Sequence, residues 1–158
     1  MESFIGWIGG KRMLRKAILE RFPTDEVGRY VEVFGGAAWV LFAKEKKANQ
    51  LEVYNDINSN LVNLFRCVKY HCGELQREME WMLTSREQFF DCLAQGQGRG
   101  LTDIQRAARF FYTVKISFGC DNRTYATSSK QVDNAVEYLE KVRERLRGGN
   151  IENKDFAD

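Results

Sequence analysis

The stretch that decides the fold is Tyr30-Val31-Glu32-Val33-Phe34-Gly35-Gly36. Its β-branched and aromatic residues, at positions 30–34, predict a short buried strand. Residues 37–44, which follow the glycines, are apolar almost all round, as is typical of a helix packed on both sides. Glycines between a strand and a helix let a ligand approach the free N–H groups of the helix. The glycine pair alone is a weak sign of binding.

A second strand–helix unit comes next. Residues 50–54 predict a strand that is closed by Asn55-Asp56, and residues 57–70 predict a helix. A further helix is expected upstream, over residues 11–22. Strand–helix–strand–helix order is typical of a doubly wound α/β sheet.

The middle of the chain has a different character. Residues 73–147 show mainly helical periodicity, with capping-box signatures at residues 85–88 and 102–105. A polar stretch over residues 120–131 interrupts the helices. Residues 150–156 predict a third strand. We therefore expect a helical insertion into an α/β domain.

Composition excludes little about partners. The 24 basic and 22 acidic residues give a net charge of +2, which favours no particular partner, and no apolar run approaches the roughly 18 residues of a membrane span. The start of the chain is not a basic signal-peptide region. The four cysteines form no C-x-x-C pair and there is one histidine, so we expect no metal site. Reduced thiols in a cytoplasmic protein are the expectation.

Three residues support the interpretation that a ligand binds beside the glycine pair. Asp56 follows Gly36 by 20 residues, a position that faces the same crevice in doubly wound folds and can accept hydrogen bonds from ribose hydroxyls. Alone, Asp56 is equally compatible with an N-cap. The dinucleotide fingerprint G-x-G-x-x-G is absent, which disfavours NAD. Lys11 is unfavourable at a helix start unless it faces a carboxylate or phosphate, and Trp7 is compatible with ordinary core.

Three segments carry a resemblance to a known family. They are Gly6-Trp7-Ile8-Gly9-Gly10-Lys11, Glu32-Val33-Phe34-Gly35-Gly36-Ala37 and Tyr54-Asn55-Asp56-Ile57-Asn58. Their order and spacing resemble those of the Dam-type DNA adenine methyltransferases, which carry K/W-x-x-G-G-K, E-P-F-x-G-x-G and A-D-I-N segments. The similarity continues through residues 105–112, 116–123 and 150–157. It therefore covers the chain from residue 4 onward.

The resemblance implies a partial Rossmann-like, S-adenosylmethionine-dependent methyltransferase sheet with a helical DNA-recognition insertion. Residues 1–72 and 148–158 would form the cofactor-binding core, and residues 73–147 the insertion. The implied activity is methyl transfer to the exocyclic amino group of adenine in double-stranded DNA. The implied cofactor contacts are Trp7, Lys11, Glu32, Phe34, Gly35, Gly36, Asp56, Ile57, Asp155 and Phe156. The implied DNA contacts are Lys115, Phe118, Arg123 and Lys130.

Departures from the family pattern bear on catalysis and specificity. Val33 stands where the family usually has proline, and Gly119 where it has a polar residue that meets the target base pair. The largest departure is that Pro23 is the single proline, so the family's Asp-Pro-Pro-Tyr segment is absent from these 158 residues. In the family that segment holds the adenine amino group and stacks on the flipped base. We expect this chain to contain no catalytic residue and to be inactive alone.

Two hypotheses follow. The chain is either the cofactor-binding and recognition part of an adenine-specific DNA methyltransferase, or a non-catalytic DNA- or protein-binding remnant of one. An Asp-Pro-Pro-Tyr segment in frame after Asp158 favours the first, and a stop codon the second. Without the catalytic strand, we expect an unpaired edge on the strand at residues 30–34 and an uncovered side on the helix at residues 37–44. A homodimer through that edge is therefore expected.

Overall fold

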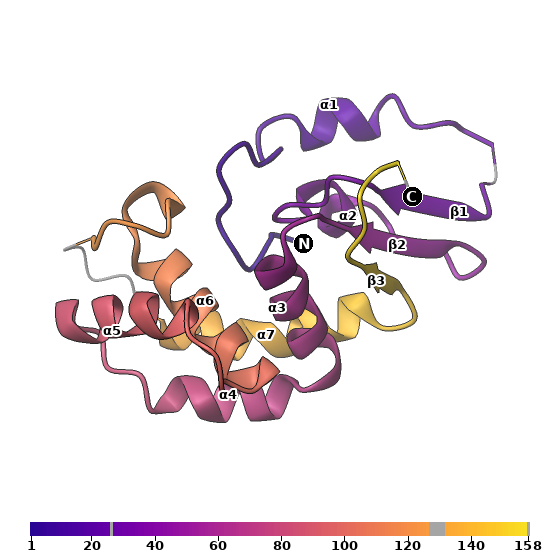
Figure 1. The fold of residues 1–158 in the computed structure, drawn as a ribbon. Helices are drawn as coiled ribbons and strands as arrows, with labels where there is room; N and C mark the ends of the chain where they lie inside the picture. The colour runs from indigo at the N-terminus through magenta and orange to yellow at the C-terminus, as the bar shows by residue number, and fades with distance from the viewer. Residues whose placement is uncertain (26, 127–131, 158) are drawn as a thin grey trace.

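The computed structural model describes residues 1–25, 27–126 and 132–157 and contains strands and helices (Figure 1). The strands are β1 (Arg29–Glu32), β2 (Leu51–Asn55) and β3 (Asn150–Glu152). The helices are α1 (Arg15–Leu19), α2 (Trp39–Ala43), α3 (Ser59–Tyr70), α4 (Cys72–Glu80), α5 (Arg86–Gly96), α6 (Asp103–Ile116) and α7 (Asp133–Leu146), with a 3-10 turn η1 (Phe118–Cys120). In the described ranges, no helix is both long enough and apolar enough to cross a membrane.

The three strands form one parallel sheet in the order β1-β2-β3. Val31 pairs with Val53, and Val53 pairs with Asn150. Helix α2 connects β1 to β2, whereas the connection from β2 to β3 contains all the helices from α3 to α7. The fold is therefore α/β with a long helical connection, consistent with a partial Rossmann-like methyltransferase sheet. The expected third strand forms, but over residues 150–152 only.

One edge of the sheet has no strand beside it in the described ranges. β1 pairs with β2 alone, which agrees with the unpaired edge expected for the strand at residues 30–34. Val31 in β1 and Val33 just after it are 44% and 36% exposed, so the strand at this edge also carries apolar side chains on an exposed face.

Local sequence explains where the longer helices begin. The Asn58 side chain accepts a hydrogen bond from the Leu61 N–H at 3.0 Å and caps α3. Thr102 and Gln105 form both bonds of a capping box at the start of α6. Such caps satisfy N–H groups that have no partner within the helix.

Two expectations about the short helices were wrong. The helix expected over residues 11–22 forms only as α1, Arg15–Leu19, because the residues on either side make turns, with bonds from the Leu14 N–H to the Lys11 carbonyl and from the Phe22 N–H to the Leu19 carbonyl. The helix after the glycine pair was expected to have an uncovered apolar side. In the structure Val40, Leu41 and Phe42 are buried. The covering groups come from Phe4 and from α1 and α7.

One continuous hydrophobic core runs from the sheet through the helical insertion. The Phe4 ring lies 6.2 Å from Phe42 on α2, 5.0 Å from Phe65 on α3 and 5.8 Å from Phe111 on α6. Helices α4, α5 and α6 lie beyond α3, away from the strands (Figure 1). The N-terminal segment therefore joins the sheet to the insertion.

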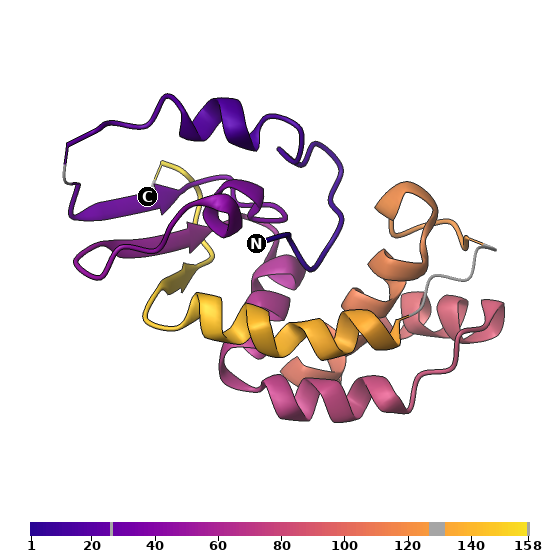
Figure 2. The same ribbon diagram turned by 180° about the vertical axis from the view of Figure 1, so that it is seen from behind.

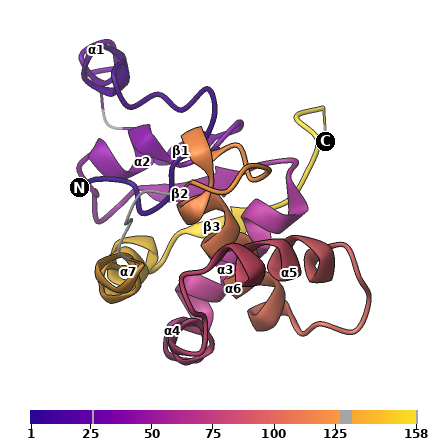
Figure 3. The same ribbon diagram turned by 90° about the vertical axis from the view of Figure 1, so that its left-hand side faces the viewer.

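Helix α7 returns from the insertion to the sheet, as seen from behind in Figure 2. It lies on the same side of the strands as α2 (Figure 3). Buried Glu52 of β2 connects the two helices, since its carboxylate is 2.8 Å from Lys44 Nζ and 2.5 Å from Arg145 Nη1. Arg145 Nη2 also donates to the Leu41 carbonyl at 2.6 Å.

Candidate functional site

The glycine turn after β1 is shaped by Tyr54. The Tyr54 ring passes directly over Gly35, so that a Cβ atom on Gly35 would lie 2.6 Å from Tyr54 Cδ2 and closer still to Cε2. Gly36 has a φ of +49°, in the left-handed region that favours glycine. The buried Tyr54 hydroxyl donates to the Gly36 carbonyl at 2.7 Å. Both glycines are thus required by geometry, one for space and one for backbone conformation.

Asp56 joins the glycine turn to the loop after β2. One carboxylate oxygen accepts the Gly36 N–H at 2.8 Å, and the other accepts the Asn58 N–H at 2.8 Å. A carboxylate offers about four lone-pair sites, so acceptor capacity remains for a ligand. The N-cap of α3 is Asn58, so the capping interpretation of Asp56 is wrong, and the ligand interpretation remains a prediction.

Two asparagines tie the ends of the three strands together. Asn55, which is buried, donates from Nδ2 to the carbonyls of Val33 (3.0 Å) and Lys154 (3.1 Å) and accepts the Lys154 N–H at 2.9 Å. Asn153 donates to the Asp56 carbonyl at 2.8 Å. Sequence reasoning missed both roles. An amide that follows a predicted strand was a signal for Asn55, whereas nothing local marked Asn153.

Exposed apolar side chains follow all three strands at their carboxyl ends. Phe34, after β1, and Phe156, after β3, are 75% and 71% exposed, and their ring centroids lie 5.7 Å apart. Ile57, after β2, is 69% exposed. The neighbouring Asp155 is exposed, and its side chain accepts the Ala157 N–H at 3.0 Å. An exposed pair of aromatic rings at this edge offers a surface for a flat apolar ligand.

The N-terminal segment brings one of its two expected residues to the turn. The Trp7 ring lies against Gly36, where a Cβ would be 3.1 Å from Trp7 Cδ1, and 6.0 Å from the ring of Phe110 on α6. Lys11 is exposed, and its ammonium donates to the Gly9 carbonyl at 2.9 Å. Trp7 thus contacts the turn, whereas Lys11 lies on the surface beside its own loop.

Glu32 is the last residue of β1, and its carboxylate lies against the first turn of α2. Its Oε2 accepts the Leu41 N–H at 2.9 Å and the Tyr30 hydroxyl at 3.3 Å. Burial raises the pKa of Glu32 to about 7, against the opposing effect of these hydrogen bonds. Glu32 therefore caps α2 from the neighbouring strand, and its charge is sensitive to pH near neutrality.

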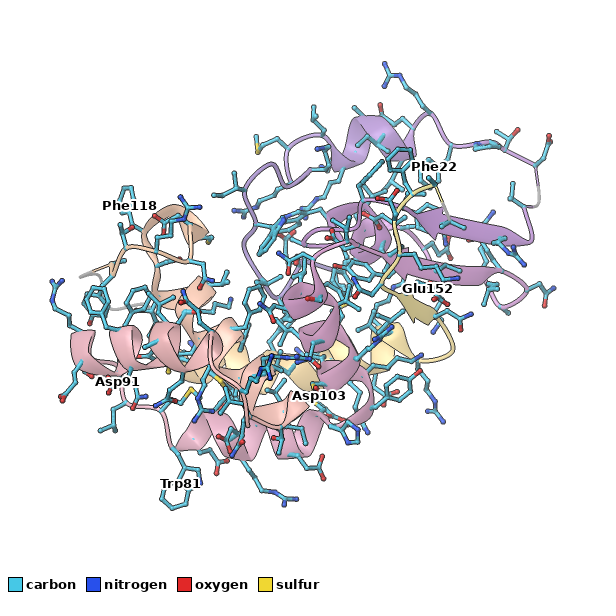
Figure 4. All side chains as sticks on the ribbon, viewed as in Figure 1. Phe22, Trp81, Asp91, Asp103, Phe118 and Glu152 are labelled. Atoms are coloured by element: carbon cyan, nitrogen blue, oxygen red, sulfur yellow. The ribbon has the colours of Figure 1, made fainter. Side chains whose placement is uncertain are left out.

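The loop of residues 117–126, which we call the recognition loop, extends from the end of α6 (Figure 4). Ser117 and Tyr125 form an antiparallel bridge, and Asp121 accepts the N–H groups of Arg123 (2.9 Å) and Thr124 (3.1 Å). Gly119 has a φ of +60°. The loop is thus held mainly by bonds within itself.

The four expected DNA contacts have different placements. Phe118 is 74% exposed at the outer end of the loop (Figure 4), and the Arg123 side chain is exposed. Lys115 is half-buried, with its ammonium 5.5 Å from the Phe111 ring centroid. Lys130 lies outside the described residues.

The recognition loop rests on the N-terminal segment. A Cβ atom on Gly6 would lie 3.3 Å from Cys120 Cβ and would overlap Cys120 Sγ. Because Gly6 adjoins Trp7, the side chain beside the glycine turn and the loop are linked through two adjacent residues. No sequence signal pointed to this contact. Among the described residues, no group of three His, Cys, Asp or Glu side chains could hold a metal ion.

Comparison with known proteins finds a matching family and several relatives. The family of D12 class N6 adenine-specific DNA methyltransferases matches residues 7–145. The chain is 28% identical over 173 residues to a type II methyltransferase, M1.LlaDCHI, of Lactococcus lactis subsp. cremoris, covering 96% of this chain and 57% of that protein. It is 24% identical over 123 residues to the type II methyltransferase M.MjaIII of Methanocaldococcus jannaschii, covering 75% of this chain and 38% of that protein. The chain thus spans little more than half the length of the first relative and less of the second.

Proposed function

Because this chain belongs to the D12 class of N6 adenine-specific DNA methyltransferases, we propose that it binds S-adenosylmethionine and double-stranded DNA for methyl transfer to the adenine amino group. The single observation that carries the proposal is the convergence of the glycine turn, Asp56 and the Phe34–Phe156 pair at the carboxyl edge of a parallel sheet. That edge is where open α/β sheets bind their ligands. Because its proposed substrate is DNA, we place the protein in the cytoplasm.

The residues at the edge fit the chemistry of this cofactor. The carboxylate of Asp56 has acceptor capacity for the two ribose hydroxyls, and the exposed rings of Phe34 and Phe156 suit the flat adenine. Ile57 and Asp155 stand beside them in the chain. We assign Trp7, Glu32 and the backbone of Gly35 and Gly36 to the remainder of the site. We assign Lys11 to the entrance of the site, because its ammonium can exchange its hydrogen bond to the exposed Gly9 carbonyl for one to a ligand. When bound, the cofactor supplies an electrophilic methyl group.

Calorimetric titration with S-adenosylmethionine tests the cofactor site. We expect Asp56→Ala to weaken binding at least tenfold, since a hydrogen bond to a charged group contributes about 1.5–3 kcal/mol. Asp91→Ala, an exposed carboxylate on α5, is the matched control. Urea unfolding of both variants separates a lost ligand contact from a lost bond to Gly36. Equal affinity in wild type and Asp56→Ala would remove Asp56 from the site.

We assign DNA recognition to residues 73–147, with Lys115, Phe118, Arg123 and Lys130 as contacts, and cofactor binding to residues 1–72 and 148–158. The exposed Phe118 and Arg123 on one loop support this division, because an aromatic ring and a guanidinium suit bases and phosphates.

We propose that these 158 residues alone bind without transferring a methyl group. The support is the single proline, Pro23, which leaves no Asp-Pro-Pro-Tyr segment to hold the amino group. The test is tritium transfer from labelled S-adenosylmethionine to unmethylated DNA. Incorporation that Asp56→Ala abolishes would contradict the proposal. The same absence supports the second candidate, a non-catalytic binding module, which predicts DNA binding that is indifferent to S-adenosylmethionine.

We also propose that the chain forms a homodimer through the free edge of β1. Exposed Val31 belongs to this edge strand and exposed Val33 follows it, and Val31 lines a cavity of about 380 Å³ whose walls are largely apolar groups, including Phe22 and Val27. A strand edge pairs readily with another strand, and two copies of one edge close as a two-fold dimer. Light scattering should give twice the mass of one chain.

Two variants sharpen the dimer test. Val31→Lys places a charge on the edge and should give monomers, whereas Met13→Lys, at an 89% exposed position off the sheet, should remain dimeric. A wild-type monomer at high concentration would overturn the dimer.

A further inference from the structure

A cavity of about 290 Å³ lies at the base of the recognition loop, between that loop and helices α3, α5 and α6. Its walls include Asn60 on α3, Gln97 after α5, Arg106 and Phe110 on α6, and Asn122 and Arg123 in the loop. We call it the arginine cavity. In Figure 4, α6 runs from Asp103 towards the loop that carries Phe118, and the cavity lies along this helix.

The lining of the cavity is basic. Three arginines line it, Arg106, Arg109 and Arg123, and no aspartate or glutamate does. Arg109 is already engaged, because its Nε donates to Gln95 Oε1 at 2.6 Å and its Nη1 lies 3.2 Å from Glu78 Oε1. The charge of Arg109 is therefore largely compensated within the protein, whereas two further guanidiniums border the same space.

Arg106 and Arg123 retain binding capacity. Arg106 Nη2 pairs with exposed Asp103 at 2.9 Å, but its Nε is buried and has no hydrogen-bond partner among the described residues. No carboxylate within the described ranges forms an ion pair with the exposed Arg123 guanidinium. The carboxylate of Asp121 is occupied by the loop itself, where it also accepts the Thr124 hydroxyl at 2.7 Å.

Asn122 adds a second unsatisfied group. Its Oδ1 is buried without a partner in the part of the chain that the structure describes, and both Asn122 and Arg106 line the cavity. A half-turn of the amide would present its N–H groups to that space, since the oxygen and nitrogen exchange places. Buried polar groups normally have partners, so two cavity-lining residues that each carry a buried polar atom without a partner point to a polar ligand at this place.

We propose that the arginine cavity binds one backbone phosphate of the target DNA, held jointly by Arg106 and Arg123 and assisted by Asn122. This rests on the proposed function as a DNA-binding protein. Guanidinium groups recognise phosphate oxygens through paired N–H donors, and an apolar wall such as Phe110 suits the adjoining deoxyribose.

The position of the cavity favours DNA as the source of the phosphate. On one side is the recognition loop, and on the other is Asn60, two residues after the Asn58 that Asp56 holds. A phosphate bound here lies between the loop and the proposed cofactor edge. Phosphate contacts of this kind fix the register of a protein on DNA and carry no sequence information themselves.

The test replaces single phosphates of a DNA duplex, one at a time, with neutral methylphosphonates. We expect one position at which neutralisation weakens wild-type binding. At that position the same replacement should have no effect on Arg106→Ala or Arg123→Ala, because the contact is already lost. Arg77→Ala, an exposed arginine on α4 outside the cavity, should keep the wild-type response.

Salt dependence supplies a second readout. Removing one phosphate contact lowers the slope of log affinity against log salt by about 0.9. Arg106→Ala and Arg123→Ala should each lower it by that amount, and the double variant should lower it no further. Two additive decreases would mean two different phosphates and would overturn the shared site. Lysine at either position keeps the charge and should restore the slope.

The outcomes distinguish this inference from the proposed function. If the wild type binds no DNA, the proposed function fails. If it binds but no position shows the shared loss, only the arginine cavity fails. Calorimetry with inorganic phosphate tests the other source. Tight phosphate binding that Arg106→Ala abolishes, without a methylphosphonate-sensitive position, would show a free-anion site and overturn the DNA assignment.

Discussion

The carboxyl edge of the sheet and the recognition loop are held in opposite ways. At the sheet edge, Asn55 and Asn153 connect segments that are about 100 residues apart in the chain, and Asp56 fixes the glycine turn. In the recognition loop, the hydrogen bonds join residues that are close in the chain, and the Asp121 carboxylate accepts three of them from residues two or three positions away. The sheet edge is held by hydrogen bonds between distant segments of the chain, and the recognition loop mainly by hydrogen bonds between residues close in the chain.

The difference suits two kinds of ligand. A small cofactor is bound best by a rigid site, because a preformed site loses less conformational entropy on binding. A DNA duplex varies in shape, and a locally closed loop can move as a unit against it. We therefore expect substitutions at the sheet edge to lower global stability, and those in the loop to change DNA binding with little effect on unfolding.

The largest expected effect is at Gly35. Gly35→Ala places a methyl group inside the Tyr54 ring, which is buried and stacked 4.1 Å from the Phe65 ring centroid. Overpacking of a fixed ring costs about 3 kcal/mol or more of unfolding free energy. Urea unfolding measures it. Gly73→Ala, in helix α4 with no atom near the added Cβ, should instead stabilise slightly. Similar stabilities for the two variants would mean that Tyr54 moves freely.

The next effect is a pH dependence from Glu32. Burial raises its pKa to about 7 from a usual value of 4.5, so the folded protein binds more protons than the unfolded chain between these values. Stability from this group is therefore full below pH 4.5 and is lost as pH rises through 7. We expect a loss of about 3 kcal/mol over this range. Glu32→Gln keeps an acceptor for the Leu41 N–H and should abolish the loss.

Asp121 in the recognition loop should make folding stability depend on pH in the opposite direction. Hydrogen bonds from the Thr124 hydroxyl and from the N–H groups of Arg123 and Thr124 lower its pKa. Its contribution is present above the unfolded pKa and is lost as pH falls through the folded pKa.

If acidification destabilised wild type and Glu32→Gln equally between pH 7 and 5, Glu32 would not be the buried titrating group.

The contrast between local and long-range contacts also explains which features could be predicted from the sequence. The glycine turn, Asp56 and the three strands were predictable, because each is encoded by neighbouring residues in a short segment. The caps of α5, by Ser85, and of α6, by Thr102, were predictable for the same reason, whereas Asn58 as the cap of α3 was not predicted. Asn153 was not, because its partner carbonyl belongs to Asp56, far away in the chain.

The wrong expectation about α2 has the same origin. The segment Trp39–Ala43 is apolar, and its sequence does not reveal what covers it. Phe4 and α7 cover it from opposite ends of the chain. Likewise, Arg106 was an ordinary exposed helix residue in sequence terms, and its place in a cavity with Arg123 depends on how the loop folds back on α6.

A smaller effect is expected from Asn55→Ala. The substitution removes three hydrogen bonds and leaves the Val33 carbonyl and the Lys154 N–H and carbonyl without this partner. Partial solvation of these groups at the sheet edge should limit the cost to about 1–2 kcal/mol. Thermal unfolding measures it, with Asn49→Ala, at an exposed position, as the control. An unchanged midpoint would mean that the strand ends are held by other contacts.

The smallest expected effect concerns the contact between the two regions. Gly6→Ala places a methyl group on the Cys120 side chain, so the recognition loop must shift while the sheet edge stays fixed. We expect DNA affinity to fall about three- to tenfold, or about 0.6–1.4 kcal/mol, with S-adenosylmethionine affinity and unfolding nearly unchanged. Cys120→Gly removes the opposing side chain, suits the left-handed φ of +60° at that position, and should restore DNA binding in the double variant. Fluorescence anisotropy on one duplex measures all four proteins as a double-mutant cycle. If Gly6→Ala weakened cofactor and DNA binding alike, and Cys120→Gly rescued neither, the N-terminal segment would act on the sheet edge through Trp7, and the two regions would be one unit.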